Sequence, residues 1–319
     1  MSKEKIPVIA VVGPTASGKT ALSIELAKHY NGEILSFDSM QIYEGMEIGN
    51  AKPTKSEMQG IPHHMVGTVS RGESFSVARY KEAADRIIPE IYARGKNVIM
   101  VGGTGLYLDS VLKNIELLED NENRDARKRL SDELVIKGPS AMYSKLMEID
   151  PKTAESLHPN NTGRVIRALE VYEVTGHTMS YQVENSRNTP TRYVSAIVGL
   201  SAVNREYLYD RINRRVDAML ANGLLYEAEK YLSEDSGGTA KQAIGYKELA
   251  PYLLDDEPLL DCIENLKRET RRYAKRQLTW FRRNPEIHWI YIDENPTLSG
   301  QLESAEKFID ESEILKKEY

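Results

Sequence analysis

The chain has 319 residues, with 42 Lys and Arg against 48 Asp and Glu, so its formal net charge is 42 − 48 = −6. Apolar residues make up 40% and charged residues 28%, which is typical of a folded chain and excludes a disordered or collagen-like one. Its length predicts roughly two domains. The single cysteine, Cys262, excludes an intramolecular disulfide and a cysteine-based zinc cluster.

Five segments combine apolar and β-branched residues between Gly or Pro punctuation, which predicts strands. In chain order they are residues 6–12, 33–37, 97–101, 193–200 and 288–292. The intervening residues 20–30 and 76–94 carry apolar side chains at helical spacing. Strands that alternate with helices predict an α/β fold, a parallel sheet flanked by helices.

The alternation stops after Leu112, and residues 121–187 contain only helical patterns, at 125–137, 140–148 and 163–175. We therefore expect an all-helical insertion over 119–190 within a discontinuous core of 1–118 and 191–319. Further helices are predicted over 205–222, 224–232 and 259–283. A last strand and a charged tail follow, and the tail after Pro296 is expected to be accessory.

A glycine-rich loop follows the first predicted strand and precedes a helix. It matches G-x-x-x-x-G-K-[ST] and consists of Gly13, Pro14, Thr15, Ala16, Ser17, Gly18, Lys19 and Thr20. Such a P-loop surrounds a diphosphate with backbone N–H groups, a lysine supplies positive charge, and a hydroxyl is available to Mg²⁺. The motif alone leaves open whether the ligand is a nucleoside triphosphate or an isoprenyl diphosphate.

Two other loops follow predicted strands at the same edge of the sheet. Asp38 follows the second strand and is either a Mg²⁺ ligand or a general base, while Gly102, Gly103, Thr104 and Gly105 follow the third. Because the carboxyl ends of neighbouring parallel strands face one crevice, we expect these loops to meet the P-loop there.

In this order the motifs resemble those of the tRNA dimethylallyltransferases. Beyond the P-loop, the matching segments are 38–43, 45–53, 62–64, 102–107, 158–160, 164–170, 242–246 and 274–283. The resemblance implies transfer of a dimethylallyl group from its diphosphate to the exocyclic amine of the adenosine immediately 3′ of the anticodon. It also implies a P-loop core with a helical insertion. A lone cysteine leaves no room for the C-terminal zinc finger of many eukaryotic members, so the bacterial form is the better match.

The resemblance also implies roles for individual residues. Asp38 becomes the general base, and Lys19, Thr20, Thr104 and Arg215 hold the leaving diphosphate together with Mg²⁺, with Thr20 as the candidate metal ligand. Recognition of the extruded adenine falls on Asp38, Ser39, Met40 and Gln41, beside Thr104. The choice of Arg215 over its neighbours Arg211 and Arg214 stays open.

A basic segment near the C-terminus predicts contact with nucleic acid. Residues 267–283 contain eight Lys or Arg and one acid, Glu269, and the basic positions recur every four residues on one helical face. The candidate tRNA contacts are Arg271, Arg272, Lys275, Arg276, Arg282 and Arg283, with Arg127, Arg164 and Arg167 in the insertion. Each arginine of the insertion, taken singly, is better explained as an ordinary surface charge.

Three other functions share part of this pattern. A small-molecule P-loop kinase explains the loop and Asp38 but not the basic segment, and an adenylate isopentenyltransferase leaves the insertion without a use. A non-catalytic RNA-binding protein leaves Lys19, Thr20, Asp38 and Thr104 unexplained. Adjacent His63 and His64 do not have the spacing of a zinc site. We expect a cytoplasmic monomer with no membrane segment, because no apolar run approaches 18 residues and no secretory signal precedes the first strand.

Overall fold

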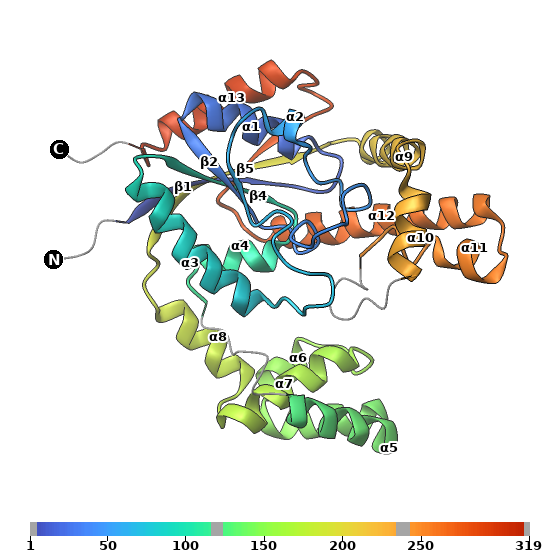
Figure 1. Ribbon diagram of the computed structural model, residues 1–319. Coiled ribbons are helices and arrows are strands. Elements are labelled where there is room, and N and C mark those ends of the chain that lie inside the picture. Colours follow the sequence, from blue (N-terminus) through green and yellow to red (C-terminus); the bar gives the residue numbers. More distant parts are fainter. Residues whose placement is uncertain (1–4, 116–123, 234–242, 316–319) are drawn as a thin grey trace. The chain divides into compact units, whose positions relative to one another are not determined.

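The computed structural model describes residues 5–115, 124–233 and 243–315. A parallel sheet of six strands forms its centre, in the order β3-β2-β4-β1-β5-β6 (Figure 1). The strands are β1 (Ile6–Val12), β2 (Gly32–Ser36), β3 (His63–His64), β4 (Asn97–Gly102), β5 (Tyr193–Ser201) and β6 (Ile287–Tyr291). The five predicted strands and the α/β fold are confirmed. The short β3 at the sheet edge is new, because two residues are too few to show a strand pattern.

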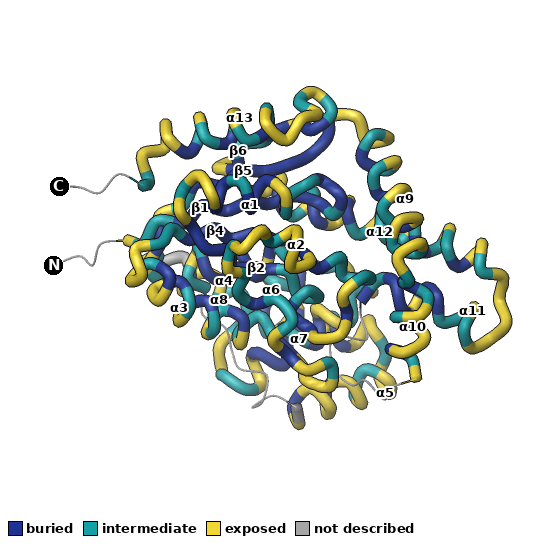
Figure 2. The backbone as a smooth tube through the Cα atoms, turned by 45° about the horizontal axis from the view of Figure 1, so that its top comes forward, coloured by how far each residue is buried: buried dark blue, intermediate teal, exposed yellow. Residues whose placement is uncertain are grey.

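The middle strands of the sheet are covered on both faces, which explains their unbroken apolar sequence. Val8 to Val12 of β1 are all fully buried, and Figure 2 shows most of this strand in dark blue. Ile9 pairs with Ile99 of β4 and with Ala196 of β5. Because all strand pairs are parallel, the loops after Val12, Ser36 and Gly102 leave the sheet at the same edge.

Helices cover the two faces of the sheet. The helices that lie wholly or partly in the sheet-containing part of the chain are α1 (Lys19–His29), α2 (Lys55–Met58), α3 (Val77–Ala93), α4 (Gly105–Leu112), α9 (Arg205–Ala221), α10 (Leu224–Ser233), α11 (Ala250–Asp255), α12 (Leu259–Phe281) and α13 (Leu298–Glu311). In Figure 1, α1 and α13 lie on one face and α3 and α4 on the other. The helices expected at 20–30, 76–94, 205–222, 224–232 and 259–283 are confirmed to within two residues at each end.

The C-terminal tail is part of the core, which corrects the expectation that it is accessory. Its helix α13 buries Ala305 and Ile309 in the same apolar cluster as Leu22 and Leu26 of α1. The many charged residues of α13 lie on its outer side and hid this amphipathic pattern in the sequence.

The described chain divides into two compact units. One holds the sheet, and the other consists of Ser76–Glu82 and Asp109–Arg192. The second unit contains α5 (Arg124–Ile149), α6 (Pro151–Glu155), α7 (Thr162–Thr175) and α8 (Met179–Asn188). The longer segment of this unit starts at Asp109, before the predicted boundary at residue 119. Asp109 lies within α4, the helix that follows β4.

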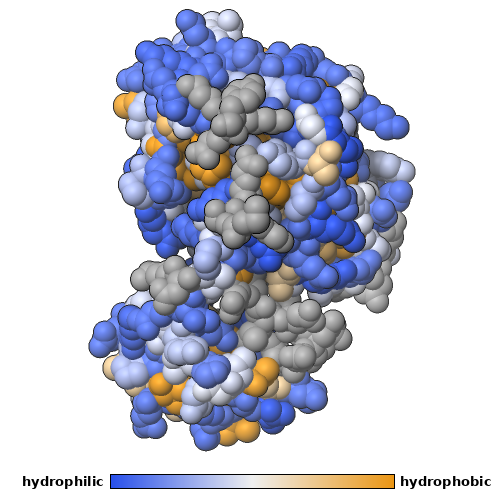
Figure 3. All heavy atoms as spheres, turned by 90° about the vertical axis from the view of Figure 1, so that its left-hand side faces the viewer, coloured by the Kyte–Doolittle hydropathy of each residue, from blue (hydrophilic) through white to orange (hydrophobic). Residues whose placement is uncertain are grey.

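The helical unit has an apolar core of its own, which includes Leu130, Leu146, Val165 and Leu169. Gly138 breaks α5 with a positive φ of 79°, at the breaker that separates the predicted helices 125–137 and 140–148. The described residues on the face displayed in Figure 3 are mostly hydrophilic, with small separate apolar patches. In the described parts of the chain, no helix is long and apolar enough to cross a membrane.

Candidate active site

The P-loop connects β1 to α1 in a conformation that only glycine allows at its start. Gly13 has a φ of +145°, and a Cβ there would lie 2.4 Å from the carbonyl oxygen of Leu200. Lys19 begins α1, and its Nζ donates to the carbonyl of Pro14 at 2.7 Å. The buried hydroxyl of Ser17 has no hydrogen-bond partner among the described residues. An unpartnered donor at the amino end of an eleven-residue helix is suited to an anion.

A cavity of about 1630 Å³ opens beside this loop at the carboxyl edge of the sheet. Its lining includes these predicted site residues: Thr15, Ala16, Gly18, Lys19, Thr20, Asp38, Ser39, Met40, Gln41, Arg215 and Arg276. Gly13, Pro14, Ser17 and Thr104 do not line it but lie in the loops that form its wall. The structure therefore brings the predicted P-loop and Asp38 together, as the strand order requires.

Asp38 is held by the backbone of its own loop. Its Oδ1 accepts hydrogen bonds from the N–H groups of Met40, at 3.0 Å, and Gln41, at 3.4 Å. The hydroxyl of Thr104 accepts from the N–H of Ser39 at 3.0 Å and donates to the Ser39 hydroxyl at 3.2 Å. The loop after β4 thus fixes the loop after β2, and Oδ2 of Asp38 remains outside these hydrogen bonds.

Three charged side chains of the cavity influence one another. Burial and the neighbouring Arg215 lower the pKa of Lys19 to about 7, and Asp38 acts in the opposite direction. Burial also lowers the pKa of Arg215, again opposed by Asp38. Two cationic side chains beside the carboxylate of Asp38 are suited to a multiply charged anion.

The three clustered arginines of α9 have different environments. Arg211 donates from Nε to the carbonyl of Ala16 in the P-loop at 2.8 Å. Arg214 is exposed and pairs with Asp210 at 2.5 Å. All three line the cavity, and Arg215 is electrostatically coupled to both Lys19 and Asp38. These environments favour Arg215 as the arginine that faces a ligand, with Arg211 as a support of the loop.

Gln277 of α12 joins two loops of the site, a role that sequence reasoning missed. Its Oε1 accepts from the N–H of Thr15 at 2.9 Å, and its Nε2 donates to the carbonyl of Gly103 at 3.0 Å. Tyr273, one turn earlier, also lines the cavity, and burial and Asp38 raise the pKa of its phenol. The sequence feature that could have indicated this role is a glutamine on the apolar face of a basic helix.

Replacement of Gln277 by leucine should destabilise the fold. The change keeps the volume but leaves the Thr15 N–H and the Gly103 carbonyl without their partner, which costs about 1–3 kcal/mol for each group. Urea denaturation followed by circular dichroism measures the free energy of unfolding. An unchanged unfolding midpoint would show that the two loops do not depend on this amide.

Some of the basic residues of α12 have partners within the protein. Lys267 pairs with Asp217 at 2.8 Å, and Arg271 donates to the side chain of Asn213 at 2.6 Å. Arg272 pairs with Glu269 at 2.6 Å but remains exposed. The exposed basic residues of the helix and its C-terminal end are Arg268, Arg272, Lys275, Arg276, Arg282 and Arg283. The predicted basic surface is therefore concentrated in the last turns of α12 and the residues just after it.

Two of the three predicted contacts in the insertion, Arg127 and Arg167, have an intramolecular partner. Arg167 donates to buried Glu170 at 3.0 Å, and Arg127 approaches the same carboxylate at 3.9 Å. Arg164 is exposed on α7. Arg127 and Arg167 therefore supply the buried carboxylate of Glu170 with opposite charge, whatever further contacts they make.

Two observations concern metals. Residues 5–115, 124–233 and 243–315 contain no group of three or more His, Cys, Asp or Glu side chains arranged to hold a metal ion. His64 instead contacts Glu33 at 2.7 Å and His63 contacts the carbonyl of Ile61 at 2.8 Å, both from strand β3. Mg²⁺ usually keeps several waters and takes one or two protein oxygens plus ligand phosphates. The hydroxyl of Thr20, which lines the cavity next to Lys19 in the chain, fits that requirement.

Comparison with known proteins gives consistent results. The sequence model of a family described as IPP transferase matches residues 41–284. A tRNA dimethylallyltransferase of Acetivibrio thermocellus is 49% identical over 90% of this chain and 92% of its own length. A crystal structure of a full-length tRNA isopentenylpyrophosphate transferase from Bacillus halodurans is 42% identical, with a TM-score of 0.66 over 96% of this chain and all of that one. A eukaryotic dimethylallyltransferase acting on tRNA is 32% identical, with a TM-score of 0.81 over 96% of this chain and 80% of that one.

Proposed function

Because this chain belongs to the IPP transferase family, we propose that it is a tRNA dimethylallyltransferase. It transfers the dimethylallyl group of dimethylallyl diphosphate to the exocyclic amine of the adenosine next to the anticodon on its 3′ side. The observation that supports this best is the cavity in which Asp38 lies with Lys19, Thr20 and Arg215. One carboxylate beside a cationic diphosphate site is what the transfer requires.

The reaction forms a C–N bond and breaks a C–O bond. The adenine amine attacks the allylic carbon, the diphosphate leaves with the electron pair of the C–O bond, and Asp38 takes the proton that the nitrogen loses. The amine is a weak nucleophile because its lone pair is delocalised into the ring, so removal of its proton during attack lowers the barrier. No covalent intermediate with the protein is needed.

Negative charge develops on the leaving diphosphate, and the P-loop provides for it. The backbone N–H groups of the loop and the side chains of Lys19 and Arg215 bind the diphosphate before the bond breaks and stabilise this charge as it develops. Thr20 would hold Mg²⁺, which supplies further charge neutralisation when bound. Thr104 keeps the Asp38 loop in place through Ser39.

The alternatives receive less support. Neither a small-molecule kinase nor an adenylate isopentenyltransferase would need the exposed basic residues at the end of α12. The names of the matching relatives also specify tRNA as their substrate. A tRNA substrate favours a cytoplasmic location. We further propose that the protein acts as a monomer, because the residues assigned to the reaction all come from a single chain.

The test is transfer of radiolabel from dimethylallyl diphosphate in the presence of Mg²⁺, with unmodified tRNA, AMP and ATP as parallel acceptors. Label in tRNA alone supports the proposal. Label in AMP or ATP would assign the chain to the adenylate enzymes, and ATP turnover without transfer would indicate a kinase.

Replacement of both Lys275 and Arg276 by glutamine should weaken tRNA binding and leave diphosphate binding at Lys19 in place. The binding constant K for tRNA falls as salt rises, because each phosphate contact releases counterions. Removal of two phosphate contacts should make the plot of log K against log salt concentration less steep by about 2. Filter binding at several salt concentrations measures this slope. The matched control replaces Lys230 and Lys307, both exposed on other helices, and equal slopes for the two double variants would contradict the assignment of this surface.

A further inference from the structure

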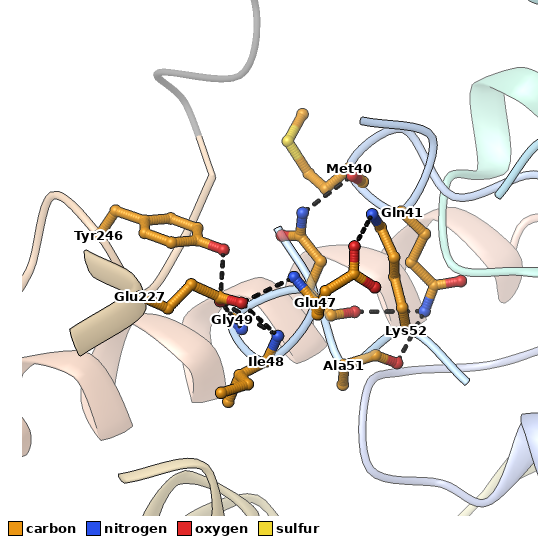
Figure 4. A network of polar contacts seen from close by, with 10 residues as sticks. Met40, Gln41, Glu47, Ile48, Gly49, Ala51, Lys52, Glu227 and Tyr246 are labelled. Atoms are coloured by element: carbon orange, nitrogen blue, oxygen red, sulfur yellow. Dashed lines mark hydrogen bonds and ion pairs between the residues drawn. The ribbon is translucent and has the colours of Figure 1, made fainter. Parts of the chain in front are cut away.

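Glu227 of α10 holds a loop of the cavity wall through its backbone. Its Oε2 accepts from the N–H groups of Glu47 and Ile48 at 2.8 and 2.9 Å, and its Oε1 accepts from Gly49 at 2.8 Å. The phenol of Tyr246 donates to the same Oε1 at 2.9 Å. Figure 4 shows this carboxylate at the centre of the convergent donors. Consecutive backbone N–H groups that point at one anion form a nest, here filled by a side chain of the protein itself.

The loop held by Glu227 in turn holds the residues that follow Asp38. The carbonyls of Asn50 and Ala51 accept from the side-chain amide of Gln41 at 3.2 and 3.1 Å. The side chain of Asn50 donates to the carbonyl of Met40 at 2.9 Å. A continuous chain of hydrogen bonds therefore runs from Glu227 through residues 47–51 to Met40 and Gln41, which lie beside the proposed general base.

The sequence of the loop is adapted to this contact. A Cβ on Gly49 would lie 2.7 Å from the phenolic oxygen of Tyr246, so only glycine lets the loop approach so closely. The side chain of Glu47 turns away and pairs with Lys52 at 2.9 Å, and the side chain of Lys52 is only 2% exposed. The loop is thus fixed at two points, by Glu227 on its backbone and by Lys52 on its side chain.

We propose that Glu227 is a positioning residue for the acceptor side of the reaction. This inference rests on the proposed function, in which Asp38 and the residues after it face the adenine. Three N–H groups and one phenol need four acceptor positions, which a carboxylate provides on two oxygens and a glutamine amide does not. Loss of the carboxylate should release residues 47–51 and leave Met40 and Gln41 poorly placed, while the P-loop stays intact.

The test compares the variants Glu227→Gln and Tyr246→Phe with Glu229→Gln, a matched control at an exposed position of the same helix. Hydrogen exchange by mass spectrometry follows the amides of residues 44–54, and steady-state kinetics gives KM separately for tRNA and for dimethylallyl diphosphate. For Glu227→Gln we expect faster exchange in this segment and a rise of about tenfold or more in KM for tRNA, the size of one hydrogen bond to a charged group. KM for dimethylallyl diphosphate should not change.

Tyr246→Phe removes one donor and keeps the three amides, so it should give a smaller effect in the same direction. A variant that merely loses folded protein would show a lower kcat with both KM values unchanged, and that result would overturn the proposal, as would unchanged exchange. If the unmodified protein transfers no label to tRNA, the proposed function fails. The exchange measurement still decides in that case whether Glu227 holds the loop.

Discussion

Replacement of Asp38 by asparagine should abolish most of the transfer activity while both substrates still bind. We expect kcat to fall by about 10³-fold, within the range usual for loss of a general base. Asparagine keeps an oxygen that can accept from the N–H of Met40, as Oδ1 does now, so the loop should keep its conformation. The change removes the charge and the basicity, and single-turnover transfer to tRNA measures the result.

Two comparisons separate the role of Asp38 in chemistry from a role in binding. The Asp38→Asn variant should bind inorganic diphosphate no more weakly than the unmodified protein, because it lacks a negative charge near the anion. Asp261→Asn, at an exposed position in the first turn of α12, serves as the control and should transfer at the normal rate. An Asp38→Asn variant with more than about a tenth of the normal rate would show that another group takes the proton.

Much of the fold follows from patterns that extend over one element. The strands before the P-loop, Asp38 and Thr104 are short apolar runs, and the helix after the P-loop has apolar residues at helical spacing. The rule for parallel sheets then places the loops after these strands together. β3 escaped prediction because two residues have no period, and α13 because its charged face outweighs its apolar one. The sheet therefore positions the P-loop and Asp38 by rules that act on sequence alone.

The supporting residues could not be predicted in the same way. Gln277 meets Thr15, and Glu227 meets the N–H groups of residues 47–49, across separations of 262 and about 180 positions in the chain. Their structural role depends on which backbone groups they contact, and this depends on how helices that are far apart in the chain pack together. A buried glutamine on a helix indicates only that a partner exists. The partner becomes known once α12 is placed against the P-loop.

Lys19 should control how diphosphate binding depends on pH. Its pKa of about 7 in the protein means that roughly half of these side chains are neutral at pH 7. A bound diphosphate is an opposite charge and raises that pKa, so binding takes up a proton. The uptake is small at pH 6, where Lys19 is already charged, and approaches one proton at pH 8. Affinity should therefore fall as the pH rises above 7.

Isothermal titration calorimetry with inorganic diphosphate, in buffers of different ionisation enthalpy, measures this proton uptake directly. Lys19→Arg is the matched control, since arginine stays charged throughout this range and leaves only the ionisation of the ligand itself. Lys19→Met should lose about a hundredfold in affinity, as expected when one partner of a buried charge pair is removed. Equal uptake at pH 8 by the unmodified protein and the arginine variant would contradict the lowered pKa. It would also show that Lys19 is fully charged before the diphosphate arrives.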